Sequence, residues 1–163
     1  MHEDANEVVD NLADMISGEA EDYSLDVKYI ELMLVKIAGE KLLIAVPDVA
    51  EIIKVQKLTI VAMVPDHLLG VCNVHGQVTC VVDPCRVMHF KGLPEADSEA
   101  TRFVILRHPQ MRLALRVDAV SELIRVLEKQ LPKVDDDFAG FFSGKVDWQG
   151  EHYPLMHAKE LFK

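Results

Sequence analysis

The chain has 163 residues, half of them apolar, which suits one compact domain or two small subdomains that share one fold. Its formal net charge of −10 comes almost wholly from residues 1–26, which contain nine acids and no lysine or arginine. The other 18 of its 27 acids nearly balance its 17 bases, so the body has no basic stripe to replace phosphate counterions, and nucleic-acid binding is not expected.

Hydropathy and cysteine content indicate the cellular compartment in which the protein is expected. No apolar run approaches the roughly 18 residues of a membrane-spanning helix, and no basic-then-apolar leader opens the chain. Three cysteines cannot all pair within one chain, so reduced thiols are the expected state. These features predict a soluble protein of the cytoplasm.

Residues 1–26 form an acidic N-terminal extension with two open interpretations. Apolar residues recur in it at helical spacing until Ser17 and Gly18 end the pattern. They are Ala5, Val8, Val9, Leu12, Met15 and Ile16. The extension is either a disordered acidic tail or an amphipathic helix whose apolar stripe docks on the body or on a partner.

Strand signals begin at Val27 and continue to the end of the chain. Before residue 65 they predict a hairpin of residues 29–37 and 41–46 that turns at 38–40, a helical turn or edge strand at 48–53, and a short strand at 59–61. After residue 90 they predict a loop over 91–100 and then a hairpin of 103–106 and 113–117, whose second strand continues over 118–127. An acidic connector over 131–137, a hairpin of 138–146 and 153–156, and a helix over 158–162 follow.

The clearest local pattern lies between Pro65 and Phe90. Residues 71–74 and 78–82 predict two strands, and residues 75–77 predict the tight turn between them, where Gly76 supplies a positive φ.

This hairpin is flanked by two short predicted helical elements. Residues 65–70 predict one helical turn closed by glycine. Asp83 and Pro84 stop the second strand, and Asp83 is the expected cap of a helix over residues 85–90. Many short strands with regularly spaced turn signals predict an all-β barrel or sandwich with a few short helices.

The stretch from Pro65 to Asp83 resembles the core motif of the CheW-like family, the adaptor domain of bacterial chemosensory arrays. The matching positions are Pro65, Gly70, Val71, Asn73, Val74, Gly76, Val78, Val81, Val82 and Asp83. The resemblance implies two five-stranded β-barrel subdomains within a CheW-like domain that we place at residues 27–163. It also implies a protein without enzymatic activity or cofactor that couples chemoreceptor cytoplasmic tips to a CheA-type histidine kinase.

The resemblance assigns residues to two partner surfaces. Val49, Glu51 and Ile52 match positions that meet the kinase regulatory domain. The positions that match the receptor-binding groove and the neighbouring V-D-x-V segment near the junction of the barrels are Gly70, Asn73, Val74, His75, Gly76, Asp118, Val120 and Leu123. Each assignment competes with a structural role: tight hairpins favour glycine and asparagine, and core packing is the simpler expectation for Val74 and Leu123.

The chain departs from the family pattern at several positions. His75 replaces the usual arginine, which offers five donors in a rigid fork and is always charged. Pro84, Ala114 and His157 replace the leucine, glycine and aspartate common there. We therefore hypothesise that His75 marks either a partner different from the standard receptor–kinase pair, as in an alternative chemosensory system that governs type IV pili, or a weakened version of that pair.

Three competing functions remain. The first is a repurposed CheW-like interaction module with a non-chemotaxis partner. The second is a zinc site, because thiolates and imidazoles cluster in sequence; its candidates are His67, Cys72, His75, Cys80, Cys85 and His89. The spacing fits no standard zinc motif, and residues three apart on a strand face opposite sides, so we predict no metal. The third is a thiol nucleophile at Cys85, which the neighbouring Asp83 opposes.

Overall fold

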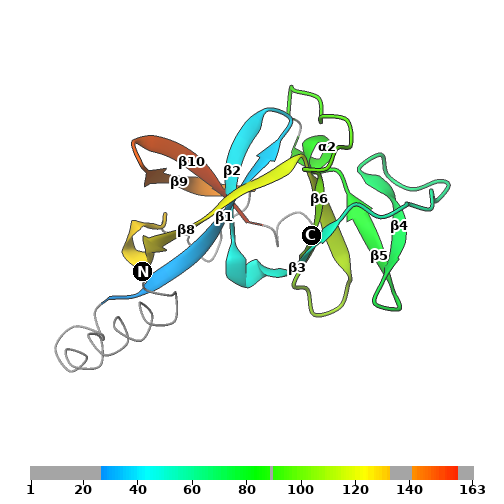
Figure 1. The fold of residues 1–163 in the computed structure, drawn as a ribbon, viewed down its shortest axis with the longest axis horizontal. Helices are drawn as coiled ribbons and strands as arrows, with labels where there is room; N and C mark the ends of the chain where they lie inside the picture. Colours follow the sequence, from blue (N-terminus) through cyan, green and yellow to red (C-terminus); the bar gives the residue numbers. More distant parts are fainter. Residues whose placement is uncertain (1–26, 89, 133–140, 158–163) are drawn as a thin grey trace, which may run out of the picture.

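The computed structural model describes residues 27–88, 90–132 and 141–157, which form two β-sheet units lying side by side (Figure 1). The predictions for residues 1–26, for most of the 131–137 connector and for the helix over 158–162 lie outside these ranges.

The first sheet contains both ends of the described chain. Its strands are β1 (Tyr29–Ile37), β2 (Glu40–Ala45), β8 (Ala119–Leu127), β9 (Phe142–Trp148) and β10 (Glu151–Met156). They follow the order β8-β1-β2-β10-β9, with β2 and β10 parallel and the other pairs antiparallel.

The second sheet holds the middle of the chain. Its strands are β3 (Val49–Lys54), β4 (Leu68–Val74), β5 (Gln77–Val82), β6 (Arg102–Leu106) and β7 (Leu113–Val117). They follow the order β3-β6-β7-β5-β4. Short helices lie at the joints: η1 (Val46–Asp48), α2 (Pro84–Met88) and η2 (Glu128–Gln130).

These two five-stranded sheets confirm the predicted all-β class and strand number. Among the described strands, neither sheet closes into a hydrogen-bonded barrel, since β8 and β9 end one sheet and β3 and β4 end the other. Four of the ten strands are therefore edge strands with backbone groups available on one side.

Apolar side chains form three buried clusters, one inside each curved sheet and one between the sheets. Leu32, Leu43 and Ile124 belong to the cluster inside the first sheet, and Phe103 and Ile105 to that inside the second. The largest cluster joins the sheets and includes Met33, Val35, Ile44, Val104, Leu115 and Val117. Because this cluster draws on both sheets, the two units form a single packed body.

Three hairpins turn through two residues that both have positive φ. The turns are Ala38-Gly39 (53° and 81°), His75-Gly76 (53° and 79°) and Gln149-Gly150 (50° and 80°). Such turns match the right-handed twist of the flanking strands. The predicted turns were correctly placed but too long, because Glu40, Gln77 and Trp148 belong to strands.

Two local predictions were wrong. Residues 65–70 do not form a helical turn. The chain makes a single turn, closed by a hydrogen bond of 3.0 Å from the Leu68 N–H to the Pro65 carbonyl, and β4 begins directly at Leu68. Residues 59–61 form no full strand, since only Thr59 makes a bridge, to Val71. The alternatives for residues 48–53 resolve into the end of η1 followed by edge strand β3.

Candidate interaction surfaces

The tip of the β4–β5 hairpin is fixed by its own side chains. Asn73 Oδ1 accepts a hydrogen bond from the Gly76 N–H at 2.8 Å, which holds the turn from within. Val74 is buried in the cluster inside the second sheet, so the core role expected for it is confirmed. His75 and Gly76 are exposed at the tip.

His75 joins the hairpin tip to the opposite edge of the same sheet. Its Nε2 lies 2.8 and 3.1 Å from the two carboxylate oxygens of Glu51 on β3. Both side chains remain exposed, at 69% for His75 and 38% for Glu51. The ion pair therefore connects residues that the sequence resemblance assigns to two different partner surfaces.

Gly70 permits a close approach of two backbone segments. Its φ is +156°, and a Cβ built there would lie 2.7 Å from the Thr59 carbonyl oxygen. Next to it, Thr59 and Val71 exchange two backbone hydrogen bonds of 2.8 and 2.9 Å. Gly70 therefore has a structural role, because it lets the 55–67 segment lie against β4.

Edge strand β3 presents an alternating surface. Val49 is buried in the cluster between the sheets, whereas Ile52 is 41% exposed although it is apolar. Ala50, Ile52 and Lys54 are exposed, and Glu51 and Ile53 between them are exposed to a smaller extent. Of the three kinase-side candidates, Ile52 and Glu51 are accessible to a partner and Val49 is not.

Asp118 lies where the chain passes from the second sheet to the first, and it is only 2% exposed. Its carboxylate accepts hydrogen bonds from the Ala38 N–H at 2.8 Å, the Glu95 N–H at 3.2 Å and Arg116 Nη1 at 2.8 Å. Ala38 follows β1 and Arg116 belongs to β7, so one carboxylate joins both sheets and the 91–100 loop.

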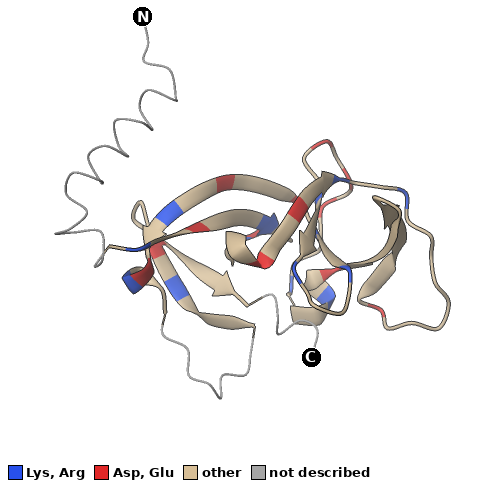
Figure 2. Cartoon of the chain, turned by 90° about the horizontal axis from the view of Figure 1, so that it is seen from below, with Lys and Arg blue, Asp and Glu red and all other residues tan. Residues whose placement is uncertain are grey.

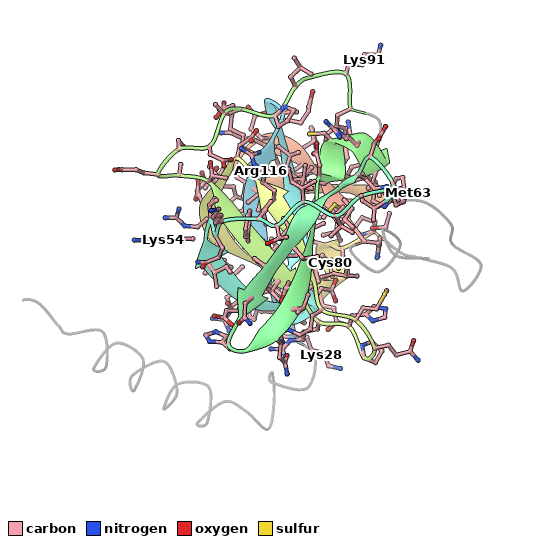
Figure 3. All side chains as sticks on the ribbon, turned by 90° about the vertical axis from the view of Figure 1, so that its right-hand side faces the viewer. Lys28, Lys54, Met63, Cys80, Lys91 and Arg116 are labelled. Carbon is pink, nitrogen blue, oxygen red and sulfur yellow. The ribbon has the colours of Figure 1, made fainter. Side chains whose placement is uncertain are left out.

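Arg116 extends this junction toward the loop, and Figure 3 marks its position in the upper part of the molecule. It donates to Asp97 Oδ1 at 2.9 Å and to the Glu95 carbonyl at 2.6 Å. Burial alone would lower the pKa of its guanidinium, but the hydrogen bonds to Asp97 and Asp118 raise it above the ordinary value. Arginine two residues before a buried aspartate carried no signal that sequence reasoning recognised.

Leu123 does not pack in the core, which contradicts the simpler expectation for it. It lies on edge strand β8, 61% exposed, while its neighbour Ile124 points into the cluster inside the first sheet. A register shift sets this alternation, since Val120 pairs with Val35 but Glu122 pairs with Leu34. Val120 packs against the cluster between the sheets and Asp118 is buried, so Leu123 is the accessible one of the three candidates in this segment.

The cysteines show no arrangement for chemistry. Asp83 Oδ1 accepts from the Cys85 N–H at 2.9 Å, which is the predicted cap of α2. Burial, followed by the Asp83 carboxylate, raises the pKa of the Cys85 thiol to about 12, and burial raises the pKa of Cys72. Within residues 27–88, 90–132 and 141–157 no group of three or more potential metal ligands gathers; His89 is outside them.

Charges of both signs are interspersed over the body (Figure 2). In the same described part of the chain, no helix has the length and apolar character needed to cross a membrane.

Comparison with known proteins gives consistent matches. A family model described as the CheW-like domain matches residues 31–163. The chemotaxis protein CheW of Bacillus subtilis (strain 168) is 32% identical over 108 residues, which are 65% of this chain and 67% of that protein. The crystal structure of the scaffolding protein TtCheW from Thermoanaerobacter tengcongensis superposes with a TM-score of 0.72 at 22% identity, covering 83% of this chain and 89% of that one.

Proposed function

The chain belongs to the CheW-like family of non-catalytic scaffold proteins, and we propose that it is an adaptor that couples chemoreceptors to a CheA-type histidine kinase in the cytoplasm. The observation that carries this proposal is the family match over residues 31–163 together with accessible apolar residues at positions that the resemblance assigns to partners. We take residues 27–163 as the adaptor domain and residues 1–26 as its extension.

The kinase side centres on β3. Ile52 offers exposed apolar area at a sheet edge, and Glu51 offers a carboxylate beside it. An edge strand with an apolar side chain is a suitable surface for another β domain, because its free backbone groups add hydrogen bonds to the apolar contact. Val49 supports this surface from the core rather than by contact.

The receptor side combines the β4–β5 hairpin with the start of β8. The exposed candidate side chains are Asn73, His75 and Leu123, and the hydrogen bond between Asn73 and Gly76 sets the shape of the tip. Gly70, Val74, Asp118 and Val120 contribute indirectly, because packing or hydrogen bonds hold them within the fold.

His75 supports a setting other than the standard receptor–kinase pair, such as a system that governs type IV pili. An imidazole has one donor when neutral, whereas arginine has five donors and a permanent charge. A receptor carboxylate that an arginine would bind bidentately would gain much less from His75. The same reasoning favours the second candidate function, a CheW-like module with a non-chemotaxis partner.

The test of the kinase side is a calorimetric titration of the full chain against the regulatory domain of each histidine kinase encoded in the same genome. We expect saturable binding that Ile52→Asp weakens at least about 10-fold, equivalent to about 1.4 kcal/mol. Ile60→Asp is the matched control, since Ile60 is 84% exposed and lies outside the proposed surface. Glu51→Lys should also weaken binding.

Two outcomes would contradict the kinase side. Equal weakening by Ile52→Asp and Ile60→Asp would show that the effect is not local to β3. Saturable binding to no kinase domain would remove kinase coupling and leave the fold with another partner.

The receptor side is tested with soluble receptor cytoplasmic fragments. Leu123→Asp should weaken binding, while Leu93→Asp, at an 86% exposed position in the 91–100 loop, should not. His75→Arg should change the ranking of receptors. Unchanged affinity of His75→Arg for every candidate receptor would overturn the idea that this position selects the partner.

A further inference from the structure

A groove between η1 and the β6–β7 connection is a cationic surface hollow that the proposed function does not use. Its wall residues include Pro47, Asp48, Ala50, Arg107, Met111 and Arg112. The floor consists of Ile105 and Leu106 from β6. Two guanidinium groups face one carboxylate there, so the groove is positive and partly apolar.

The walls of this groove are held in place by hydrogen bonds. The Arg107 N–H donates to the Asp48 carbonyl at 2.9 Å, which ties the connection to η1. His108 Nδ1 accepts from the Gln110 and Met111 N–H groups at 3.1 Å each, which fixes the bend of the connection. Arg112 Nε donates to Thr79 Oγ1 at 3.3 Å. A hollow whose shape is preset costs little ordering when a segment binds in it.

The cations of this groove are available for an acidic ligand. Within the described ranges, the Arg107 side chain is exposed and makes no hydrogen bond or ion pair, and the two Nη groups of Arg112 make none. The two arginines that line a hollow beside the 91–100 loop differ, because Arg86 pairs with Asp83 and Arg116 pairs with Asp97 and Asp118. Met111, 42% exposed, adds apolar area beside the free charges.

The chain carries a segment of matching chemistry. Residues 19–26, with the sequence EAEDYSLD, contain four acids and no base, together with the apolar bodies of Tyr23 and Leu25. Charge-assisted hydrogen bonds from guanidinium to carboxylate are about twice as strong as neutral ones. Acids for Arg107 and Arg112 and apolar side chains for Met111 are thus present in one short stretch.

The attachment point of this segment lies within reach of the groove. Leu32 is the partner of Ala45, and Ala45 directly precedes η1, whose Pro47 and Asp48 line the groove. At about 3.3 Å per residue along the strands, the path from Val27 to Pro47 through this pairing is at most about 30 Å. Residues 19–26 span up to about 26 Å when extended, which is comparable with this upper bound, so the acids at the N-terminal end of the segment, Glu19 and Glu21, are the ones that reach the groove.

We propose that the acidic segment at residues 19–26 binds in the Arg107–Arg112 groove of its own chain. Tethering raises the effective concentration of the segment into the millimolar range, so even a weak charged contact is populated. The contact does not depend on the proposed kinase or receptor, and the groove lies beside Ala50 at the start of β3.

The test is zero-length carbodiimide cross-linking of the full chain carrying Arg107→Lys, with cross-linked peptides identified by mass spectrometry. The variant puts a primary amine in the groove that forms an amide only with a carboxylate in contact. Arg102→Lys is the matched control, because Arg102 lies at the other end of the same strand, β6. We expect at least several-fold more links from residue 107 than from residue 102 to acids within 19–26.

Salt and isotope labelling distinguish the sources of a link. Links from residue 107 should fall sharply at about 1 M salt, where the Debye length is about 3 Å. In a mixture of ¹⁴N and ¹⁵N chains, links should join peptides of the same isotope. Equal yields from residues 107 and 102 would overturn the proposal, and mixed-isotope links would assign the groove to the segment of a second copy instead.

A second measurement does not rely on lysine. Backbone amide hydrogen exchange of residues 19–26 should be several-fold slower in the full chain than in the Arg107→Glu variant, which changes an exposed side chain only. Lys54→Glu is the control for charge reversal elsewhere on the exposed surface. The same exchange rate in all three chains would contradict docking in the groove.

Discussion

Removal of the Asp118 carboxylate should destabilise the whole domain. In Asp118→Ala, the Ala38 and Glu95 N–H groups lose their buried acceptor, and Arg116 loses one of its two carboxylate partners. Breaking a buried ion pair from one side costs about 3–5 kcal/mol, and bonds to a charged group are worth about 1.5–3 kcal/mol each. Because Arg116 keeps Asp97, we expect the lower part of this range, about 3–4 kcal/mol.

Urea unfolding followed by circular dichroism measures this loss. For a domain of this size, a loss of about 3–4 kcal/mol corresponds to a decrease in Tm of roughly 10 °C. Asp118→Asn keeps the shape but loses the charge, so it should fall between wild type and Asp118→Ala. Asp147→Ala is the control: its ion pair with His152 is exposed and should be worth less than about 1 kcal/mol. A cost below about 1 kcal/mol for Asp118→Ala would refute the idea that this carboxylate joins the sheets.

Two further predictions concern glycine and cysteine. Gly70→Ala should destabilise the domain more than Gly76→Ala in the same unfolding assay, because a Cβ at Gly70 meets the Thr59 carbonyl whereas one at Gly76 meets no atom within 4 Å. We expect a loss of unfolding free energy of about 2–3 kcal/mol for Gly70→Ala and of about 1 kcal/mol for Gly76→Ala. Equal losses would contradict the steric role of Gly70. In maleimide labelling followed by peptide mapping, Cys80, which is only partly buried, should react first. Cys85 should stay unmodified up to about pH 9, since its pKa is raised to about 12. The folded-state pKa of Cys85 lies above the ordinary 9.0, so its contribution to stability is full below pH 9 and is lost as the pH rises through about 12. Labelling of Cys85 by maleimide as fast as Cys80 would refute its burial.

Local patterns in the sequence predicted most of the strands because their signals are local. The runs that became β1, β2, β4 and β5 alternate or are rich in β-branched residues, and each hairpin turn ends in a glycine. The predictions that were wrong concern segments whose backbone conformation is determined by tertiary contacts. Residues 65–70 have a helix-like ending, but Gly70 is needed for the approach of Thr59, so the chain extends there instead.

The candidate site was less predictable than the fold, because exposure depends on register. Leu123 and Ile124 are both apolar in sequence, and the bulge in β8 decides that Ile124 is buried and Leu123 is exposed. Likewise, the role of Asp118 depends on Arg116 and on a loop residue more than twenty positions earlier, Glu95. No local pattern contains that information.

The Glu51–His75 ion pair limits how strongly the two proposed partner surfaces can influence each other. It is a direct side-chain link between β3 and the hairpin tip, and both of its side chains are exposed. An exposed pair contributes at most about 1 kcal/mol, which corresponds to a factor of about five in affinity. A partner that takes Glu51 for its own contacts would release His75 at the tip, so through this pair binding on one side changes the affinity on the other by no more than this factor. An arginine at position 75 would hold Glu51 with two parallel hydrogen bonds and a permanent charge, so the histidine makes the link between the surfaces weaker.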